Sequence, residues 1–276
     1  MNKIKRIYIE ITNKCNLRCK FCSFHHRPFH EMSLEEFETI LLNIKHITPF
    51  IYLHVQGEPL IHTKFDEIMS LCDKHAMNVQ LVTNGTYLAN QPNLINHPSL
   101  RKISLSLHSL DYQNCDIEEY MKTILNFIHD FTNSKYGFAE LRFWVSDNLN
   151  ERANLALKMI KDNYQLKPTN KPNSYSLQER VYLHFENQFT WPSEENSDDL
   201  CGTCRGGKDM LAILADGTIV PCCLDAEGCI NLGNIHTETI TDVLFSERYL
   251  RMIKGFNENK LIEPLCKSCQ YRKRFD

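Results

Sequence analysis

The sequence predicts an α/β protein: a partial, TIM-like (β/α)6 barrel followed by a small domain made of a β-hairpin and a helix. Extended β-branched segments alternate with longer helical patterns from residue 5 to about residue 190, an order typical of βαβ units in a parallel sheet. Within the extended segments, apolar and polar residues alternate. After residue 200, an Asp-Gly turn between two apolar arms indicates a hairpin.

The barrel elements follow one another in order. The expected strands are residues 5–12, 50–56, 78–84, 101–108, 138–146 and 179–186. The expected helices are residues 33–47, 64–76, 116–133 and 150–165. The first of these helices begins with Ser33-Leu-Glu-Glu36, a capping box that satisfies backbone N–H groups at the helix start.

The alternation predicts which face of each strand lines the interior. Ile7, Ile9 and Ile11 share one face of the first strand, and Glu10 lies on the other. A closed eight-stranded barrel fills its interior with branched apolar side chains, so a polar inner face indicates an open barrel lined for a ligand. We expect substrate contacts from four polar residues: His54, Arg142, His184 and Glu186. An antiparallel sheet with one solvated face gives the same alternation, but helix-length connections disfavour it.

The composition changes near residue 191. Residues 191–199 are polar and acidic, which indicates a linker, so we expect one domain at 1–190 and a second at 191–276. The second domain should contain the hairpin at 210–222 and a helix at 239–254.

Charge and hydropathy exclude several classes of protein. The net charge is −3 and the pI is near 6.5, so we expect neither nucleic acid nor an anionic membrane as a partner. No stretch approaches the roughly 18 apolar residues that span a bilayer, and the N-terminal residues lack a signal-peptide core. We therefore expect a cytoplasmic protein.

The 12 cysteines are placed unevenly. Three form a C-x3-C-x2-C loop (Cys15, Cys19 and Cys22), seven follow residue 200, and Cys72 and Cys115 lie between and are expected to be buried thiols. A disulfide framework is not expected in the cytosol, so the grouped thiols indicate metal. Three thiolates leave one iron of a 4Fe-4S cluster open to another ligand. A Cys3His zinc site that uses His25 or His26 fits the same loop.

The loop resembles that of the radical S-adenosylmethionine (radical SAM) superfamily, which also carries an aromatic residue, here Phe21, before the third cysteine. The resemblance implies that SAM binds the open iron and that one electron from the cluster cleaves it to methionine and a 5'-deoxyadenosyl radical. This radical takes a hydrogen atom from substrate. It also implies an external electron donor such as flavodoxin or ferredoxin.

Further segments resemble elements of the same superfamily. Gly57-Glu58 is similar to the Gly-Gly-Glu element, with Gln56 in place of the first glycine, and implies that Glu58 accepts hydrogen bonds from the SAM ammonium group. Asn84 lies in a Thr-Asn-Gly segment of the kind that contacts SAM. As ordinary turns, both segments are also common in unrelated proteins.

The fourth strand ends in a segment similar to the family's Ser-x-Asp-Gly. The resemblance assigns a SAM contact to Ser106, and His108 stands where the family often has aspartate. An interior histidine held by hydrogen bonds is the alternative for His108.

The tail resembles the SPASM/twitch domain, which holds auxiliary 4Fe-4S clusters. Its cysteine spacing is similar to the single-cluster twitch pattern of the butirosin-type inosamine dehydrogenase. The resemblance implies four ligands to one auxiliary 4Fe-4S cluster: Cys204, Cys222, Cys266 and Cys269. Cys201, Cys223 and Cys229 would be spare, with Cys201 the rival of Cys204 as a ligand. Zinc held by two C-x2-C pairs is the structural alternative.

These features predict a radical SAM oxidoreductase acting on a small molecule or a peptide. A fully ligated auxiliary cluster suits electron transfer, so a net two-electron oxidation is expected. One alternative is a ribosomal-peptide maturase that forms crosslinks, although a first strand near residue 5 leaves no room for an N-terminal peptide-recognition domain. The other is a non-enzymatic zinc-binding interaction protein.

Overall fold

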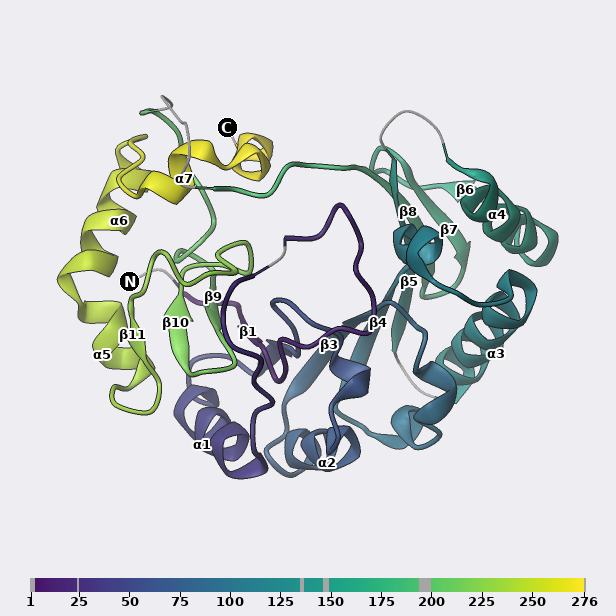
Figure 1. Ribbon diagram of the computed structural model, residues 1–276, viewed down its shortest axis with the longest axis horizontal. Coiled ribbons are helices and arrows are strands. Elements are labelled where there is room, and N and C mark those ends of the chain that lie inside the picture. The colour runs from purple at the N-terminus through teal and green to yellow at the C-terminus, as the bar shows by residue number, and fades with distance from the viewer. Residues whose placement is uncertain (1–2, 24, 135–136, 146–148, 194–199, 276) are drawn as a thin grey trace.

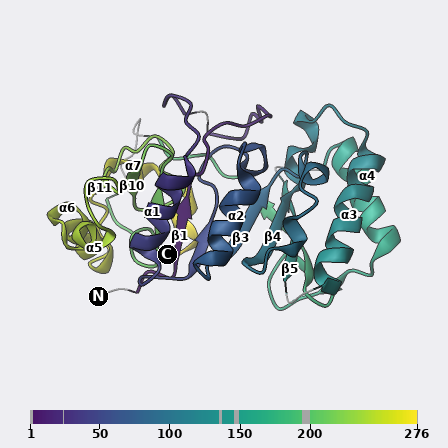
Figure 2. The same cartoon turned by 90° about the horizontal axis from the view of Figure 1, so that it is seen from below.

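A computed structural model describes residues 3–23, 25–134, 137–145, 149–193 and 200–275. The strands follow an open arc, and the helices α1 to α4 lie on its outer side (Figure 1). The view from below shows the same helices lined up along one side of the sheet (Figure 2). The segment that follows the first strand crosses the inside of the arc (Figure 1).

The six expected barrel strands are present and pair in parallel in chain order, which confirms the predicted fold class. They are β1 (Arg6–Ile9), β2 (Phe50–Tyr52), β3 (Asn78–Thr83), β4 (Leu100–Ser106), β5 (Phe138–Val145) and β8 (Val181–Asn187). β2 is shorter than predicted, so His54 and Gln56 lie in the segment that follows it. The expected last residue of the fifth strand, at 146, lies outside the described residues.

The four expected barrel helices are also present. They are α1 (Leu34–Ile44), α2 (Phe65–Lys74), α3 (Ile117–Ser134) and α4 (Glu151–Asn163). The predicted capping box is confirmed, because Ser33 Oγ accepts from Glu36 N and Ser33 N donates to the Glu36 carboxylate. Short 3-10 helices follow several strands: η1 (Pro59–Ile61), η2 (Leu88–Asn90), η3 (Leu94–Asn96) and η4 (Leu107–Tyr112).

The sheet continues beyond the six strands at both edges. β9 (Met210–Ile213) pairs in parallel with β1, and β10 (Thr218–Val220) and β11 (Gly233–Asn234) follow antiparallel. At the other edge β7 (Ser174–Gln178) and β6 (Lys167–Pro168) are added antiparallel to β8. The tail hairpin, expected in a separate small domain, is therefore hydrogen-bonded into the barrel sheet. The domain boundary at 190/191 stays a prediction, and residues 194–199 of the expected linker lie outside the described residues.

The tail helix expected at 239–254 is two helices, α5 (Ile240–Phe245) and α6 (Glu247–Asn257). Ser246 separates them, because its extended backbone ends α5 and its hydroxyl caps α6 by accepting from Tyr249 N at 3.3 Å. The short helices α7 (Pro264–Ser268) and η5 (Gln270–Arg274) end the chain.

The apolar face of the strands forms the core under the helices. Ile9, Leu53, Leu105, Leu141 and Leu183 have no exposed surface, and each side chain buried in this way stabilises the fold by about 1.5–3 kcal/mol. The polar side chains of the same strands then face the inside of the arc, as the alternation predicts.

Candidate iron-sulfur and substrate site

The first cysteine group lies in the loop between β1 and α1. Burial, together with the nearby Cys15 and Cys22 thiols, raises the pKa of Cys19 to about 12. Burial and the Cys15 thiol raise the pKa of Cys22 to about 11. The three thiols therefore lie close enough to disfavour each other's charge. Iron binding removes this penalty, since the metal replaces the protons and neutralises the thiolates.

The two histidines that follow the loop are the candidate fourth ligands of a Cys3His zinc site, and both contact other groups. His25 Nε2 lies 3.0 Å from the Asn13 carbonyl oxygen, and His26 Nδ1 lies 3.1 Å from the Glu227 carboxylate. Neither histidine joins the cysteines, so the Cys3His zinc site is not assembled.

Gly57 brings its turn against the start of this loop. Its φ of +79° is in the left-handed region, and a Cβ there would lie 2.3 Å from the Thr12 carbonyl oxygen. The next amide, Glu58 N, donates to the Lys14 carbonyl oxygen at 2.8 Å. Only glycine allows the two backbones to approach this closely.

Glu58 is buried and connects this turn to the end of β3. Its carboxylate accepts from Thr83 Oγ1 at 2.6 Å, Asn84 N at 2.7 Å and Leu60 N at 3.1 Å. Burial raises its pKa to about 7 despite these hydrogen bonds. Since a carboxylate offers about four acceptor positions, one remains for a ligand.

Asn84 lies beside the cysteine loop. Its Nδ2 donates to Asn16 Oδ1 at 3.0 Å and lies 4.0 Å from Cys15 Sγ. Its carbonyl oxygen accepts from Tyr120 Oη at 2.7 Å. The Thr-Asn-Gly segment thus forms part of the wall around Cys15, at the carboxyl end of a parallel strand.

An aromatic group lies over the ends of β4 and β5. The His108 and Trp144 rings stack with centroids 4.3 Å apart, and Phe21 packs edge-on to each at 5.1 Å. These rings line a cavity of ≈ 200 Å³. Ser106 ends β4 just before this group.

His108 is buried beside Arg142. Burial and the Arg142 guanidinium lower the pKa of His108 to about 3, so it is neutral. Its Nδ1 lies 3.2 Å from the Arg142 carbonyl oxygen. His108 is therefore an interior, hydrogen-bonded histidine that also lines the cavity.

The four expected substrate residues lie on the inner face of the arc. His184 Nε2 is 3.4 Å from Glu140, which also pairs with Lys102 at 2.6 Å. Burial alone would raise the pKa of Glu140, but hydrogen bonds from His184 and Lys102 hold it at about 2. Glu186 lies 3.2 Å from Arg142 Nη2.

His54, the fourth of these residues, lies at the edge of the Tyr8 and Tyr52 rings. Burial and the Arg142 guanidinium lower its pKa to about 3. His54 is thus a neutral group within reach of the Arg142 charge.

The four expected auxiliary cysteines gather in the tail. The pKa of Cys222 is raised, first by burial and then by the nearby thiols of Cys223, Cys204 and Cys266. The pKa of Cys266 is also raised, first by burial and then by the nearby thiols of Cys204 and Cys269. Cys201 is exposed and pairs through its backbone with Lys260.

Two further residues of the tail, neither expected from the sequence, face the barrel. The Cys223 thiol, next to Cys222, is hydrogen-bonded to the Tyr8 side chain inside the arc, and burial raises its pKa to about 11. Tyr271, two residues after Cys269, has Cys223, Glu186 and Arg142 among its charged or titratable neighbours. Cys222 and Cys223 lie in the bend and turn that follow β10, so strand periodicity gave no signal for the direction of Cys223.

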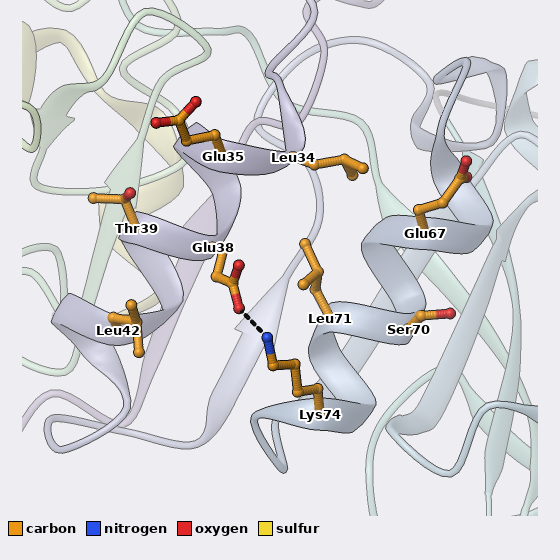
Figure 3. A pocket seen from close by; sticks show the side chains of 9 residues that line it. All are labelled: Leu34, Glu35, Glu38, Thr39, Leu42, Glu67, Ser70, Leu71 and Lys74. Atoms are coloured by element: carbon orange, nitrogen blue, oxygen red, sulfur yellow. Dashed lines mark hydrogen bonds and ion pairs between the residues drawn. The ribbon is translucent and has the colours of Figure 1, made fainter.

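A second hollow lies outside the barrel, between α1 and α2 (Figure 3). Leu34, Leu42 and Leu71 line it, and the ion pair of Glu38 with Lys74 at 2.7 Å bridges it. Neither cysteine group borders it, so we do not assign it to the site.

The chain combines an open barrel, a three-cysteine loop after the first strand, a polar interior and a cysteine-rich tail. Together these features define a class of iron-sulfur enzymes. Two family models match this chain: the radical SAM superfamily at residues 9–142 and the SPASM iron-sulfur cluster-binding domain at residues 204–270. The chain belongs to the radical SAM superfamily and carries a SPASM domain, which confirms both resemblances. Its cofactors are SAM, a 4Fe-4S cluster and an auxiliary cluster.

Related proteins agree with this assignment. The GTP 3',8-cyclase of Campylobacter fetus subsp. fetus is 23% identical over 268 residues, which cover 80% of each chain. A probable GTP 3',8-cyclase of Methanocaldococcus jannaschii is 31% identical over 116 residues, which cover 40% of this chain and only 38% of that protein.

Solved structures share the fold. BtrN in complex with AdoMet and 2-DOIA has a TM-score of 0.57 at 16% identity, covering 98% of this chain and 94% of that one. Native anSMEcpe with bound AdoMet has a TM-score of 0.65 at 17% identity, covering 97% and 86%. No helix in the described part of this chain is long and apolar enough to cross a membrane.

Proposed function

We propose that this protein is a radical SAM oxidoreductase that catalyses a net two-electron oxidation of a substrate held inside the barrel. Cys15, Cys19 and Cys22 would hold the cluster that binds SAM. When bound, this cluster and SAM supply the 5'-deoxyadenosyl radical that takes a hydrogen atom from substrate. One auxiliary 4Fe-4S cluster would accept the remaining electron.

The observation that carries this proposal is the position of the auxiliary cysteines. Cys222 has the expected ligands Cys204 and Cys266 among its neighbours, while Cys223 is hydrogen-bonded to Tyr8 inside the arc. Tyr271 follows the expected ligand Cys269 and faces the same interior. The auxiliary site thus borders the space where substrate would bind, which an electron acceptor requires and a purely structural site does not.

The remaining residues have supporting roles in this proposal. Glu58 would accept from the SAM ammonium group through its remaining acceptor position, and Gly57 keeps that turn against the loop. Other contacts to SAM are proposed from Phe21, Asn84, Ser106 and His108. Substrate contacts are proposed from His54, Arg142, His184 and Glu186. The proposed auxiliary ligands are Cys204, Cys222, Cys266 and Cys269.

The proposal also covers the start of the tail domain, the electron donor and the cellular compartment. The SPASM-type tail would begin near residue 191, and an external donor such as flavodoxin or ferredoxin would supply the electron. The cytoplasm is the proposed compartment, because cytosolic thiols stay reduced and so remain able to bind iron.

Peptide modification is the second candidate. The titles of similar structures name peptides: SuiB from Streptococcus suis bound to precursor peptide SuiA, and anSMEcpe with a Kp18Cys peptide. An open barrel admits an extended chain as readily as a small molecule.

Iron analysis tests the proposal. After anaerobic reconstitution we expect about eight irons per chain from two cubanes, and 5'-deoxyadenosine from SAM with a strong reductant. Changing Cys15, Cys19 and Cys22 together to Ala should leave about four irons and abolish cleavage. Zinc without iron, or an intact cluster that never cleaves SAM, would overturn the proposal.

The same analysis decides between the two possible tail ligands. Cys204→Ala should lose the auxiliary iron, whereas Cys201→Ala should keep it, because Cys201 is exposed. The reverse result would make Cys201 the ligand.

A further inference from the structure

Two guanidinium groups converge on one carboxylate inside the arc. Arg142 Nη2, from β5, lies 3.2 Å from Glu186 Oε2, and Arg274 Nη1, from η5, lies 3.9 Å from the same oxygen. All three side chains are partly open, with 22%, 38% and 33% of their surface exposed for Arg142, Arg274 and Glu186. The group is partly exposed and is shared by the barrel and the tail.

The charges on this inner face do not balance. Glu140 is neutralised by Lys102 at 2.6 Å. Glu186 supplies one negative charge for Arg142 and Arg274 together, and Arg6 adds a further positive charge near Tyr8. Within the Arg142, Glu186 and Arg274 group, one carboxylate faces two guanidinium groups, so the three side chains carry an excess of one positive charge.

Neighbouring side chains on this face respond to the Arg142 charge or lack hydrogen-bond partners. The Arg142 guanidinium, after burial, lowers the pKa of both His54 and His108 to about 3, so Glu186 does not cancel its field. In addition, His54 Nδ1, Trp144 Nε1 and Arg6 Nε are buried without a hydrogen-bond partner among the described atoms. Buried nitrogens of this kind are costly unless protein, water or a ligand supplies hydrogen-bond partners.

We propose that Arg142 and Arg274 form an anion-binding site, and that the substrate carries an oxyanion group, phosphate or carboxylate, that takes the place Glu186 occupies between them. This inference rests on the proposed function, since it names the substrate class of the same site. Guanidinium groups suit the role because their planar fork matches the oxygens of carboxylate and phosphate. Glu186 acts as an internal competitor that keeps the two guanidinium groups paired until substrate arrives.

Arg274 extends this site beyond the residues expected from sequence. Its guanidinium also donates to the Asn187 carbonyl oxygen at 3.2 Å and lies 4.5 Å from the centroid of the Tyr271 ring. These contacts hold it at the end of β8, facing Glu186. The tail therefore contributes a substrate-binding residue as well as cluster ligands.

The test is calorimetric titration of the full-length, reconstituted enzyme with SAM bound, using three probes. Pyrophosphate and glutarate carry the two kinds of oxyanion, and spermidine is the cationic control. We expect the enzyme to bind one or both anions and not to bind spermidine. Tighter binding of pyrophosphate would indicate a phosphate-bearing substrate, and tighter binding of glutarate a carboxylate-bearing one. Arg142→Gln and Arg274→Gln should each weaken binding about tenfold or more, the loss of one charge-assisted contact.

Glu186→Gln separates this site from a purely structural ion-pair network. If Glu186 competes with the ligand, this variant should bind the anion several-fold more tightly than wild type. If the carboxylate only stabilises the fold, binding should stay the same or weaken. Lys158→Gln is the matched control, because it removes an exposed ion pair on α4 and should change nothing.

Several outcomes would overturn the inference: no anion binding by wild type, unchanged binding in both arginine variants, or weaker or unchanged binding in Glu186→Gln. Circular dichroism on each variant confirms the fold. Iron content and 5'-deoxyadenosine formation are measured on the same samples. If the wild-type enzyme holds intact clusters and cleaves SAM but binds no anion, only this inference is wrong. If the wild-type enzyme does not cleave SAM at all, the proposed function is wrong.

Discussion

Arg27 donates to both carboxylate oxygens of Glu10, each at 2.8 Å, inside the protein. The same guanidinium donates to the Ala226 carbonyl oxygen at 2.7 Å. Glu10 in turn accepts from Gln56 N at 3.0 Å and from Ala215 N at 2.9 Å. This one ion pair therefore connects the cysteine loop, the turn before Glu58 and the tail hairpin.

Arg27→Gln should destabilise the protein strongly, because it leaves the Glu10 charge buried without its partner. The expected loss is about 3–5 kcal/mol in the free energy of unfolding, measured by urea denaturation of the cluster-free chain. Lys158→Gln, which breaks an exposed pair, is the control and should unfold at the wild-type urea concentration. Equal midpoints for Arg27→Gln and wild type would show that the pair contributes little.

Gly57→Ala should disturb the turn against the cysteine loop. A methyl group there meets backbone oxygens that cannot move aside, so we expect a loss of about 1–3 kcal/mol in stability, together with weaker SAM binding. The matched control is Gly228→Ala, where φ is also positive, at +76°, but the nearest atoms are side chains at 3.3 Å and beyond. If both variants lose the same stability and neither changes SAM affinity, the close approach is unimportant.

Glu58 predicts how stability and SAM binding depend on pH. Burial raises its pKa from 4.5 to about 7, so between these values the folded chain holds a proton that the unfolded chain has lost. Its contribution to stability is complete below pH 4.5 and is lost as the pH rises through about 7.

SAM affinity should change in the opposite direction. The SAM ammonium group needs the carboxylate form of Glu58, so affinity should rise between about pH 6 and about pH 8. Equilibrium dialysis at several pH values measures this. Glu58→Gln should bind SAM weakly and without the slope, and a variant that keeps the slope would assign the titration to another group.

Cys222 and Cys223 are adjacent but should behave differently. Cys222→Ala should lose the auxiliary cluster and hold about four irons, while Cys223→Ala should keep about eight because its thiol faces Tyr8. Cys222→Ala should still cleave SAM but give 5'-deoxyadenosine with little oxidised product. The measurements are iron, sulfide and the ratio of product to 5'-deoxyadenosine. A folded Cys222→Ala variant with the wild-type ratio would mean that the auxiliary cluster is structural.

Local sequence patterns were sufficient to predict much of the fold of this protein. The presence of the six barrel strands and four barrel helices, and the polar inner face, follow from periodicity, because each is set by neighbours within a few residues. The three-cysteine loop was equally readable, since its ligands lie within eight residues of one another, from Cys15 to Cys22. The same holds for the Ser33 capping box.

Contacts between distant segments depended on the tertiary structure. An apolar strand such as β9 is a suitable partner for any open sheet edge, and only packing of the whole chain places it beside β1. Glu10 was assigned to the inner face correctly, but its partner Arg27 lies in a loop without periodicity. Arg274 lies 88 residues after Glu186, since 274 − 186 = 88, and no local pattern relates them. The proposed site therefore combines cysteines set by short-range spacing with charged groups, such as Glu186 and Arg274, that meet only when the sheet curves and the tail packs against it.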